Sequence, residues 1–244
     1  LITDAEERDV MVNTVAPVWD GNETWLVLGG AGLLAAFPLA YSVILSALHL
    51  PLVFMLLGLI FRGVAFEFRF KADPHHRPLW DRAFVLGSLC ATFFQGVTLG
   101  AYIEGIPVVD RAYQGGAWDW ISPFSLFTGV GLVVGYALLG CTWLIMKTEG
   151  RLHRHMCTLA RPLTLALLAV IAALSLWTPL AQPQIAQRWF SLPNMFWFLP
   201  MPLLVAAAGF DLVRRVRGTP NAGPFVLALC LVFVPFQPIR VEWN

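Results

Sequence analysis

"TWLVLGGAGLLAAFPLAYSVILSALHLPLVFMLLGLIF" (residues 24–61) runs for 38 residues without a lysine, arginine, aspartate or glutamate. About 20 apolar residues cross a bilayer as a helix, so this stretch is long enough for nearly two crossings. Pro38 divides the stretch, and a proline is well tolerated in the first turn of a helix. The sequence therefore predicts two membrane helices joined by a tight connection at this proline.

The whole chain has the composition of a membrane protein. Of its 244 residues, 58% are hydrophobic and only 13% are charged, whereas roughly a quarter of the residues in soluble domains are charged. We predict an all-α, polytopic integral membrane protein with about seven transmembrane helices in a single transmembrane domain over residues 1–244. The apolar segments are 14–37, 39–66, 80–104, 121–147, 160–180, 192–213 and 222–239.

The basic residues predict how these segments are oriented. If the connection near 67–82 is cytoplasmic, thirteen of the sixteen lysines and arginines lie on the cytoplasmic side, as the positive-inside rule requires. The N-terminal end of the chain is then cytoplasmic as well. Because the basic residues are spread over several loops, they do not form a nucleic-acid-binding face.

Two acids lie just before the long apolar run. Asp20 and Glu23 are three residues apart and would share one helix face. Carboxylates at this depth are costly unless they meet a cation, a wet cavity or a partner. Counted from the Pro38 turn, Arg62 on the next helix is offset by about 9 Å, within reach of a long side chain.

Residue chemistry alone leaves the role of this group open. Asp20, Glu23, Arg62 and Glu67 are consistent with a structural ion-pair cluster at the membrane edge. They are also consistent with a cytoplasmic mouth for proton uptake, because ionisable groups inside membranes often mark ion paths. A secondary transporter that uses Asp20 and Glu23 as coupling carboxylates is the alternative from another class, although we find no clear internal repeat.

Other polar residues in or near the apolar segments are weaker candidates. His49 lies in the middle of the second segment and is predicted to be buried, either as a hydrogen-bonded structural histidine or as a proton relay. "HRHMC" (153–157) has the residue types of a metal site but is predicted to be a solvated cytoplasmic loop. We predict no metal site in this chain. Glu104 is expected to face solvent at the outer interface.

Two groups of charges near segment ends have simple interpretations. Arg69 and Lys71 suit contact with anionic lipid headgroups. Asp211 is expected to pair locally with Arg214 and Arg215 at a helix end, with little effect on stability.

Three stretches resemble a known family. "WDGNETW" (19–25), "MLLGLIFRGVAFEFRFK" (55–71) and "PFSLFTGVGLVVGYALLGCTWLIMKTEG" (123–150) closely resemble subunit 2 of the cytochrome bd-type quinol oxidases, including the cyanide-insensitive branch. The resemblance extends from about Arg8 to about Leu231. It implies a fold of two four-helix bundles with a peripheral helix, in the bacterial cytoplasmic membrane.

The resemblance also implies a function. Such oxidases take electrons from membrane quinol and reduce dioxygen to water with protons from the cytoplasm. Haem b, haem d and the quinol-oxidising site belong to the larger subunit 1, and a small accessory transmembrane subunit and a structural quinone accompany some members. Subunit 2 stabilises the haem-bearing partner and contributes a proton path. The acid of the WDGNE motif at the entrance of that path matches Asp20, and Glu23 lies in the same motif.

The sequence departs from the family at both ends. The family has a further span before the first segment, and the stretch "VFVPFQPIRVEWN" (232–244) does not resemble the family's C-terminal region with its final span. We therefore expect a fragment that lacks the family's first and last spans.

Overall fold

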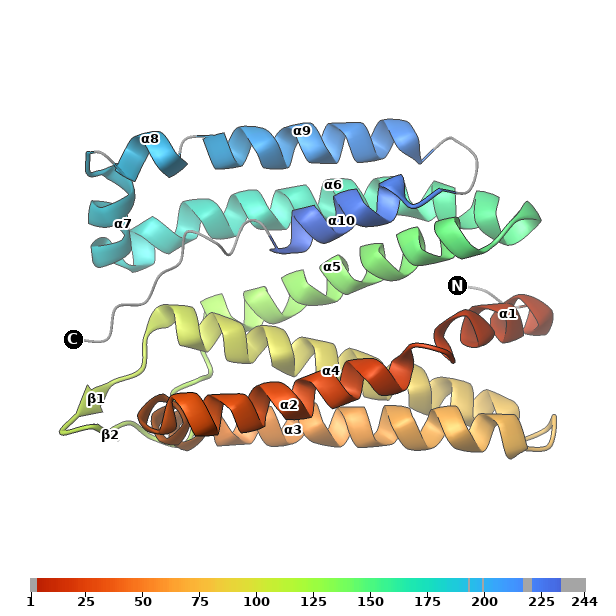
Figure 1. Cartoon of the computed structure of the whole chain (residues 1–244), viewed down its shortest axis with the longest axis horizontal. Coiled ribbons are helices and arrows are strands. Elements are labelled where there is room, and N and C mark those ends of the chain that lie inside the picture. Colours follow the sequence, from red (N-terminus) through yellow and green to blue (C-terminus); the bar gives the residue numbers. More distant parts are fainter. Residues whose placement is uncertain (1–3, 193, 199, 217–220, 234–244) are drawn as a thin grey trace. The chain divides into compact units, whose positions relative to one another are not determined.

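The computed structural model describes residues 4–192, 194–198, 200–216 and 221–233. It is almost entirely helical, with one small hairpin (Figure 1). The helices are α1 (Ala5–Val15), α2 (Trp19–Ala36), α3 (Pro38–Lys71), α4 (Arg77–Glu104), α5 (Pro123–Lys147), α6 (Gly150–Ala181), α7 (Pro183–Phe190), α8 (Asn194–Phe198), α9 (Pro200–Arg215) and α10 (Gly223–Phe233). The strands are β1 (Val108–Val109) and β2 (Ala112–Tyr113), which pair antiparallel.

Each predicted apolar segment is helical over most of its described residues. Within the described part of the chain, five helical stretches are long and apolar enough to cross a membrane: α3, α4, α5, α6 and the α8–α9 stretch Asn194–Arg215. Shorter apolar helices cover Thr24–Ala36 and Gly223–Phe233. The prediction of an all-α polytopic membrane protein is confirmed. Pro38 is the first residue of α3, as predicted, and Phe37 separates it from α2.

The chain divides into two compact units, of which one holds residues 42–133 and the other holds the residues before and after. The expectation of a single transmembrane domain is not tested by this division. α5 begins in the first of these units and ends in the other.

In the unit of residues 42–133, small residues let the helices approach closely. A Cβ placed on Gly58 of α3 would lie 2.6 Å from the backbone nitrogen of Ala91 on α4. On a different face of α4, which packs against α5, a Cβ on Gly100 would lie 2.6 Å from the Cα of Ser125. Real side chains do not fit at such distances, so these glycines fix backbone-to-backbone packing of the kind that small residues permit in membranes.

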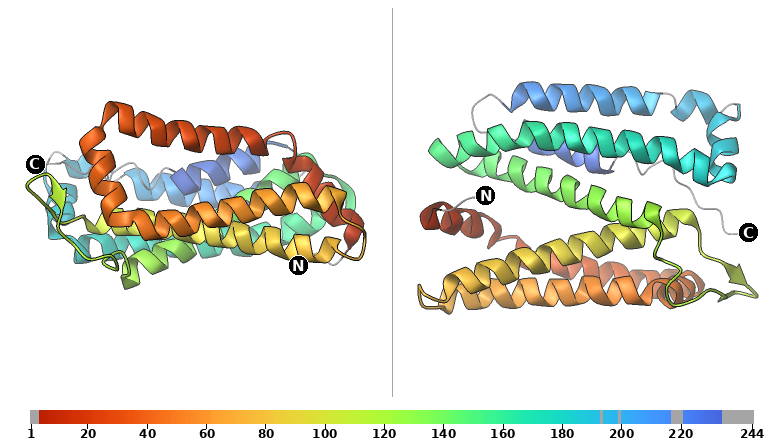
Figure 2. Two further views of the ribbon diagram at one scale, coloured as in Figure 1. Left: turned by 90° about the horizontal axis from the view of Figure 1, so that it is seen from below. Right: turned by 180° about the vertical axis from the view of Figure 1, so that it is seen from behind.

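A kink divides α3 near its start. Leu48 has φ −114° and ψ 18°, outside the helical range, and the first turns of the helix bend away there (Figure 2, left). Pro51 lies three residues further on, and its ring has no N–H to donate to the carbonyl of Ala47 and crowds that carbonyl. The proline therefore explains the kink.

The other unit has a leucine-rich core built from α5, α6, α9 and α10. Its fully or nearly fully buried side chains include Leu138, Ile145, Leu152, Leu167, Leu212 and Leu231. Met11 of α1 packs against this core. α7 turns across the end of α6 and leads into α8 and α9 (Figure 1).

Two elements differ from the sequence-based expectations. α1 is a helix in a stretch that is polar and acidic, and the side chain of Asp4 caps it by accepting a hydrogen bond from the backbone N–H of Glu6 at 3.0 Å. α6 begins at Gly150, about ten residues before the predicted start of its apolar segment. Polar residues in its first turns lowered the hydropathy without ending the helix.

Candidate functional site

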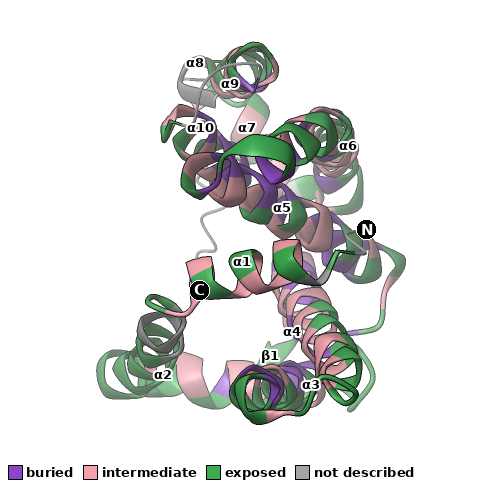
Figure 3. Cartoon of the chain, turned by 90° about the vertical axis from the view of Figure 1, so that its right-hand side faces the viewer, coloured by how far each residue is buried: buried purple, intermediate pink, exposed green. Residues whose placement is uncertain are grey.

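Asp20 and Glu23 lie in the first two turns of α2, three residues apart on a helical backbone. Their side chains lie outside the part of the chain that the structure describes, so the roles predicted for them remain predictions. From Thr24 to Gly32 the side chains of α2 are exposed (green in Figure 3). Among them, Trp25 is 72% exposed and Val27 is 69% exposed. The helix that carries the WDGNETW motif thus leaves most of its apolar surface uncovered within this chain.

Arg62 and Glu67 lie on different faces of α3. Arg62 is half-buried on the face that packs against α4, where a Cβ on Gly87 would lie 2.8 Å from the backbone nitrogen of Arg62. Phe66 follows four residues later on the same face and is buried, as helical spacing requires. Glu67 is exposed. The structure therefore places these two predicted supporting residues on one helix, with their side chains in different environments.

His49 is exposed, which corrects the expectation of a buried histidine. Ala47, Leu48 and Pro51 around it are buried at the kink of α3, and His49 lies on the opposite side. Its Nδ1 is 3.0 Å from the carbonyl oxygen of Ser46. A carbonyl only accepts, so Nδ1 carries the proton in this contact. A relay role for His49 remains an untested prediction.

A buried ion pair joins the end of α3 to the start of α4. Arg69 Nε donates to Asp81 Oδ1 at 2.5 Å, and the two side chains are 7% and 19% exposed. Arg69 is therefore directed into the protein, and the expectation that it contacts lipid headgroups is wrong. Both residues lie within about one turn of the short α3–α4 connection, so the pair holds the two helix ends together.

The HRHMC stretch is helical, and it buries His153 and Met156 while Arg154 and His155 are exposed, which corrects the expectation of a solvated loop. It lies in the first turns of α6, where His153 is 8% exposed and Met156 is 4% exposed. His153 Nδ1 is 3.1 Å from the carbonyl oxygen of Ile145, so Nδ1 is the donor and Nε2 is the acceptor nitrogen of the neutral ring. The thiol of Cys157 lies 3.5 Å from that Nε2. These contacts explain His153 as a histidine that joins α6 to α5.

At the other end of α4, a hydrogen-bonded connection leads to α5. Glu104 is half-buried and accepts a hydrogen bond from the hydroxyl of Ser122, so it does not simply face solvent as expected. The hydroxyl of Tyr113 lies 2.7 Å from the carbonyl oxygen of Gly116 and 3.1 Å from a carboxylate oxygen of Asp119. Burial, then the hydrogen bond to Asp119 and its negative charge, raise the pKa of Tyr113 above its usual value.

The described residues contain no group of three or more His, Cys, Asp or Glu side chains that could hold a metal ion.

The motifs on α2, α3 and α5 agree with a comparison with protein families. The model of the family described as cytochrome bd terminal oxidase subunit II matches residues 1–239. The chain belongs to this family. The resemblance found in the WDGNETW and FRGVAFEFR stretches is thereby confirmed.

Curated relatives have the same description. Cytochrome bd-I ubiquinol oxidase subunit 2 from Escherichia coli (strain K12) is 34% identical over 177 residues, which make up 70% of this chain and 47% of the relative. Cytochrome bd ubiquinol oxidase subunit 2 from Bacillus subtilis (strain 168) is 37% identical over 152 residues, or 61% of this chain and 45% of the relative. The chain thus spans about half the length of the curated relatives that it matches.

Proposed function

We propose that this chain is the non-haem subunit of a bd-type terminal quinol oxidase in a bacterial cytoplasmic membrane. The observation that carries the proposal is the family match over residues 1–239, together with relatives whose names specify ubiquinol oxidase subunits. In the proposed complex, membrane quinol is oxidised and dioxygen is reduced to water. Haem b, haem d and the quinol-oxidising site lie in the partner subunit, where they carry out the electron-transfer chemistry.

The first role proposed for this chain is support of the haem-bearing partner. The exposed apolar side chains of α2 favour this role. Because the rest of the chain leaves them uncovered, they are available for contact with another chain or with lipid. A small accessory transmembrane subunit and a structural quinone are further components that the resemblance implies. We assign no residue of this chain to either.

The second role is proton uptake from the cytoplasm, with Asp20 at the entrance of the path. An Asp carboxylate at the head of an apolar helix binds a proton from cytoplasmic water and releases it to a chain of water molecules that leads toward the partner's oxygen-reducing site. In this proposal the Arg62 guanidinium would favour the charged carboxylate and burial would favour the neutral one, so the balance of the two would set the pKa of Asp20. Glu23 is proposed as a second, weaker acceptor in the same motif.

The orientation agrees with this role. Most basic residues fall on the side that holds the N-terminal end of the chain and the α3–α4 connection, so we place that side in the cytoplasm. Asp20 then lies on the cytoplasmic side of the membrane, from which the protons come.

The test is an Asp20→Asn substitution in the full-length subunit, assayed as quinol-driven oxygen consumption by isolated membranes. Removal of a group that transfers protons is expected to slow turnover on the order of a hundredfold. Visible absorption spectra of the same membranes report how much haem is assembled. The matched control is Asp211→Asn, which neutralises an exposed acid on the same proposed side of the membrane.

Slow turnover with normal haem absorption in Asp20→Asn, and normal turnover in Asp211→Asn, would support the proton role. Unchanged turnover in Asp20→Asn would contradict it and leave a structural ion-pair cluster as the better interpretation. If this subunit does not co-purify with a haem-bearing chain, that result would contradict the proposed oxidase and favour a transporter.

A further inference from the structure

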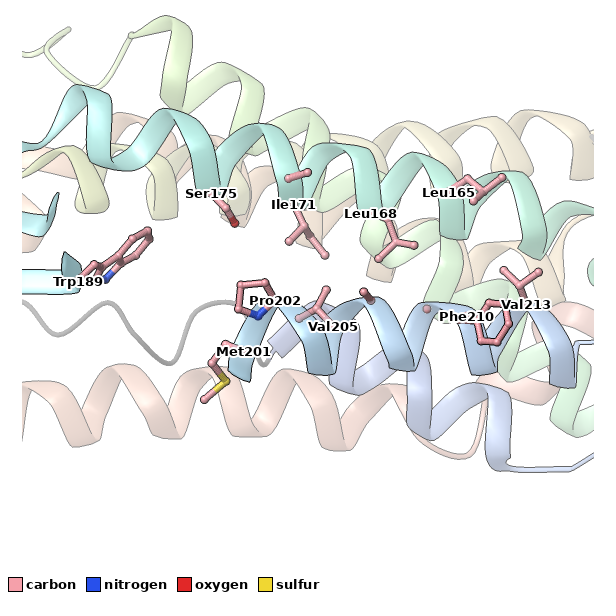
Figure 4. A pocket seen from close by; sticks show the side chains of 13 residues that line it. Leu165, Leu168, Ile171, Ser175, Trp189, Met201, Pro202, Val205, Phe210 and Val213 are labelled. Atoms are coloured by element: carbon pink, nitrogen blue, oxygen red, sulfur yellow. The ribbon is translucent and has the colours of Figure 1, made fainter. Parts of the chain in front are cut away.

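A cavity of about 530 Å³ lies between α6 and α9, and Trp189 of α7 lines one end of it. Its volume falls within the range of roughly 300–1,000 Å³ that is typical of ligand pockets. Its walls are mostly Leu, Ile, Val, Ala, Met and Phe side chains (Figure 4). Ala172 and Ala206 line the cavity and are also exposed, so the cavity opens to the surface of the chain as a groove.

The polar groups of this groove are gathered at one end. Among its lining residues, only Ser175 and Trp189 carry a side-chain oxygen or nitrogen, and both lie at the α7 end (Figure 4). The indole ring of Trp189 closes that end. Its Nε1 is shielded from solvent and has no hydrogen-bond partner among the described residues. A buried N–H without an acceptor is costly, so this end favours a ligand that brings one.

The α7 end of the groove also has the properties of a membrane interface. α6 and the α8–α9 stretch are both long and apolar enough to span a bilayer, and α7 lies across the end of α6 (Figure 1). α7 (PQIAQRWF) alternates polar and apolar residues at helical spacing, as helices that lie in the interface do. Tryptophan is enriched at this depth. The other end of the groove, near Leu165 and Phe210, lies further along the two spanning helices.

We propose that the α6–α9 groove holds one acyl chain of a membrane phospholipid, with the ester group beside Ser175 and Trp189. The ester carbonyl supplies the acceptor that the polar end lacks, and the hydrocarbon chain fills the apolar remainder. The groove opens sideways from two spanning helices, so in a bilayer its neighbours are lipid acyl chains rather than water. This site is separate from the proposed proton path and does not depend on it.

The probe is a phosphatidylethanolamine that carries a diazirine in its acyl chain, incorporated into vesicles with the full-length subunit in its purified complex. After irradiation, mass spectrometry of the peptides is expected to find the label on α6 and α9 at residues that line the groove. Native mass spectrometry of the complex in detergent would measure in parallel how much phospholipid each variant retains.

Two neighbouring alanines provide a matched pair of variants. Ala206→Phe places a ring in the groove, whereas Ala207→Phe places the same ring on an exposed position that does not line it. We expect Ala206→Phe to lower labelling of the groove at least about tenfold, and Ala207→Phe to leave it unchanged. The Ser175→Ala/Trp189→Phe double variant keeps the groove but removes both polar groups, and should weaken retention roughly two- to tenfold per lost hydrogen bond.

Three results would overturn the proposal. These are equal labelling of the groove in both alanine variants, label spread evenly over all lipid-facing helices, and a purified complex that retains quinone but no phospholipid at this site. If Ala206→Phe does not fold, phospholipid retention by the Ser175→Ala/Trp189→Phe double variant tests the proposal instead, because these two substitutions only remove atoms. Oxygen consumption is measured separately, so failure of the lipid site and failure of the oxidase proposal are distinguishable.

Discussion

The helix pairs α3–α4 and α6–α9 use the same two features, a glycine at the contact and an Arg–Asp pair near a helix end, with opposite consequences. In α3–α4 the glycine, Gly58, faces backbone atoms of the neighbouring helix. In α6–α9 the three atoms nearest to a Cβ on Gly209 all belong to the side chain of Leu168, and Gly209 also lines the groove. The surroundings of each feature, more than its residue type, decide what it contributes.

The Arg–Asp pairs differ in the same way. Arg69 and Asp81 are nearly buried and join two helices, whereas Arg215 and Asp211 are 56% and 41% exposed and lie one turn apart on α9. The local Arg215–Asp211 pair was expected from the sequence and is confirmed at 2.7 Å. Exposed pairs of this kind contribute about 0.3–0.5 kcal/mol. A buried pair that loses one partner leaves an uncompensated charge.

The largest effect is therefore expected from Arg69→Met. It removes the guanidinium that donates to the part-buried Asp81 carboxylate, and loss of one partner of such a pair should lower the free energy of unfolding by about 3 kcal/mol. For a chain of this size that corresponds to a melting temperature lower by roughly 10 °C, measurable by differential scanning fluorimetry in detergent. Arg215→Met is the control and should shift the melting temperature by about 2 °C or less.

A second variant shows whether the buried charge is the cause. Arg69→Met/Asp81→Leu removes both partners, and replacing a buried pair with apolar residues is often neutral. We expect the double variant to melt within a few degrees of the unmodified protein. If it is as unstable as Arg69→Met alone, the loss comes from packing and not from the broken Arg69–Asp81 pair.

A smaller effect is expected from Gly58→Ala. Its Cβ would meet the backbone of Ala91 at 2.6 Å and the carbonyl oxygen of Gly87 at 2.8 Å, so α3 and α4 would have to separate. Overpacking of this kind costs about 1–3 kcal/mol. Gly140→Ala on α5 is the control, because nothing lies within 4 Å of its Cβ and alanine favours the helix by about 0.5–1 kcal/mol. Opposite shifts of the melting temperature in the two variants would support backbone-to-backbone packing of α3 and α4 at Gly58, and equal shifts would contradict it.

The sequence predicted the membrane helices well because few structures other than a membrane-spanning helix suit a long run of apolar residues. Its errors occurred where polar residues are covered by neighbouring elements. The first turns of α6 resembled a loop because His153 and the arginines beside it are polar, but packing against α5 buries His153. Arg69 resembled a headgroup contact because its partner, Asp81, comes twelve residues later and across a turn. Hydropathy does not report such pairings.

The candidate site shows a different limit. Asp20 and Glu23 were identified from an unusual position, two acids at the head of an apolar helix, but residue chemistry left both a structural cluster and a proton path open. The family motif, rather than geometry, favours the second. The α6–α9 groove was not predictable, because its closed end depends on α7, a short amphipathic helix too brief to be recognised by hydropathy.

The smallest effect is expected from Gly209→Ala. Its Cβ would lie 2.7 Å from a terminal carbon of Leu168, and a leucine side chain can change its rotamer at a cost of about 0.5–1.5 kcal/mol. Alanine gains about 0.5–1 kcal/mol in a helix interior, so the two contributions nearly cancel and the melting temperature should change by about 2 °C or less. The displaced Leu168 would turn into the groove, which predicts less phospholipid bound at nearly unchanged stability. A large loss of stability instead would mean that α6 and α9 are packed as rigidly as α3 and α4.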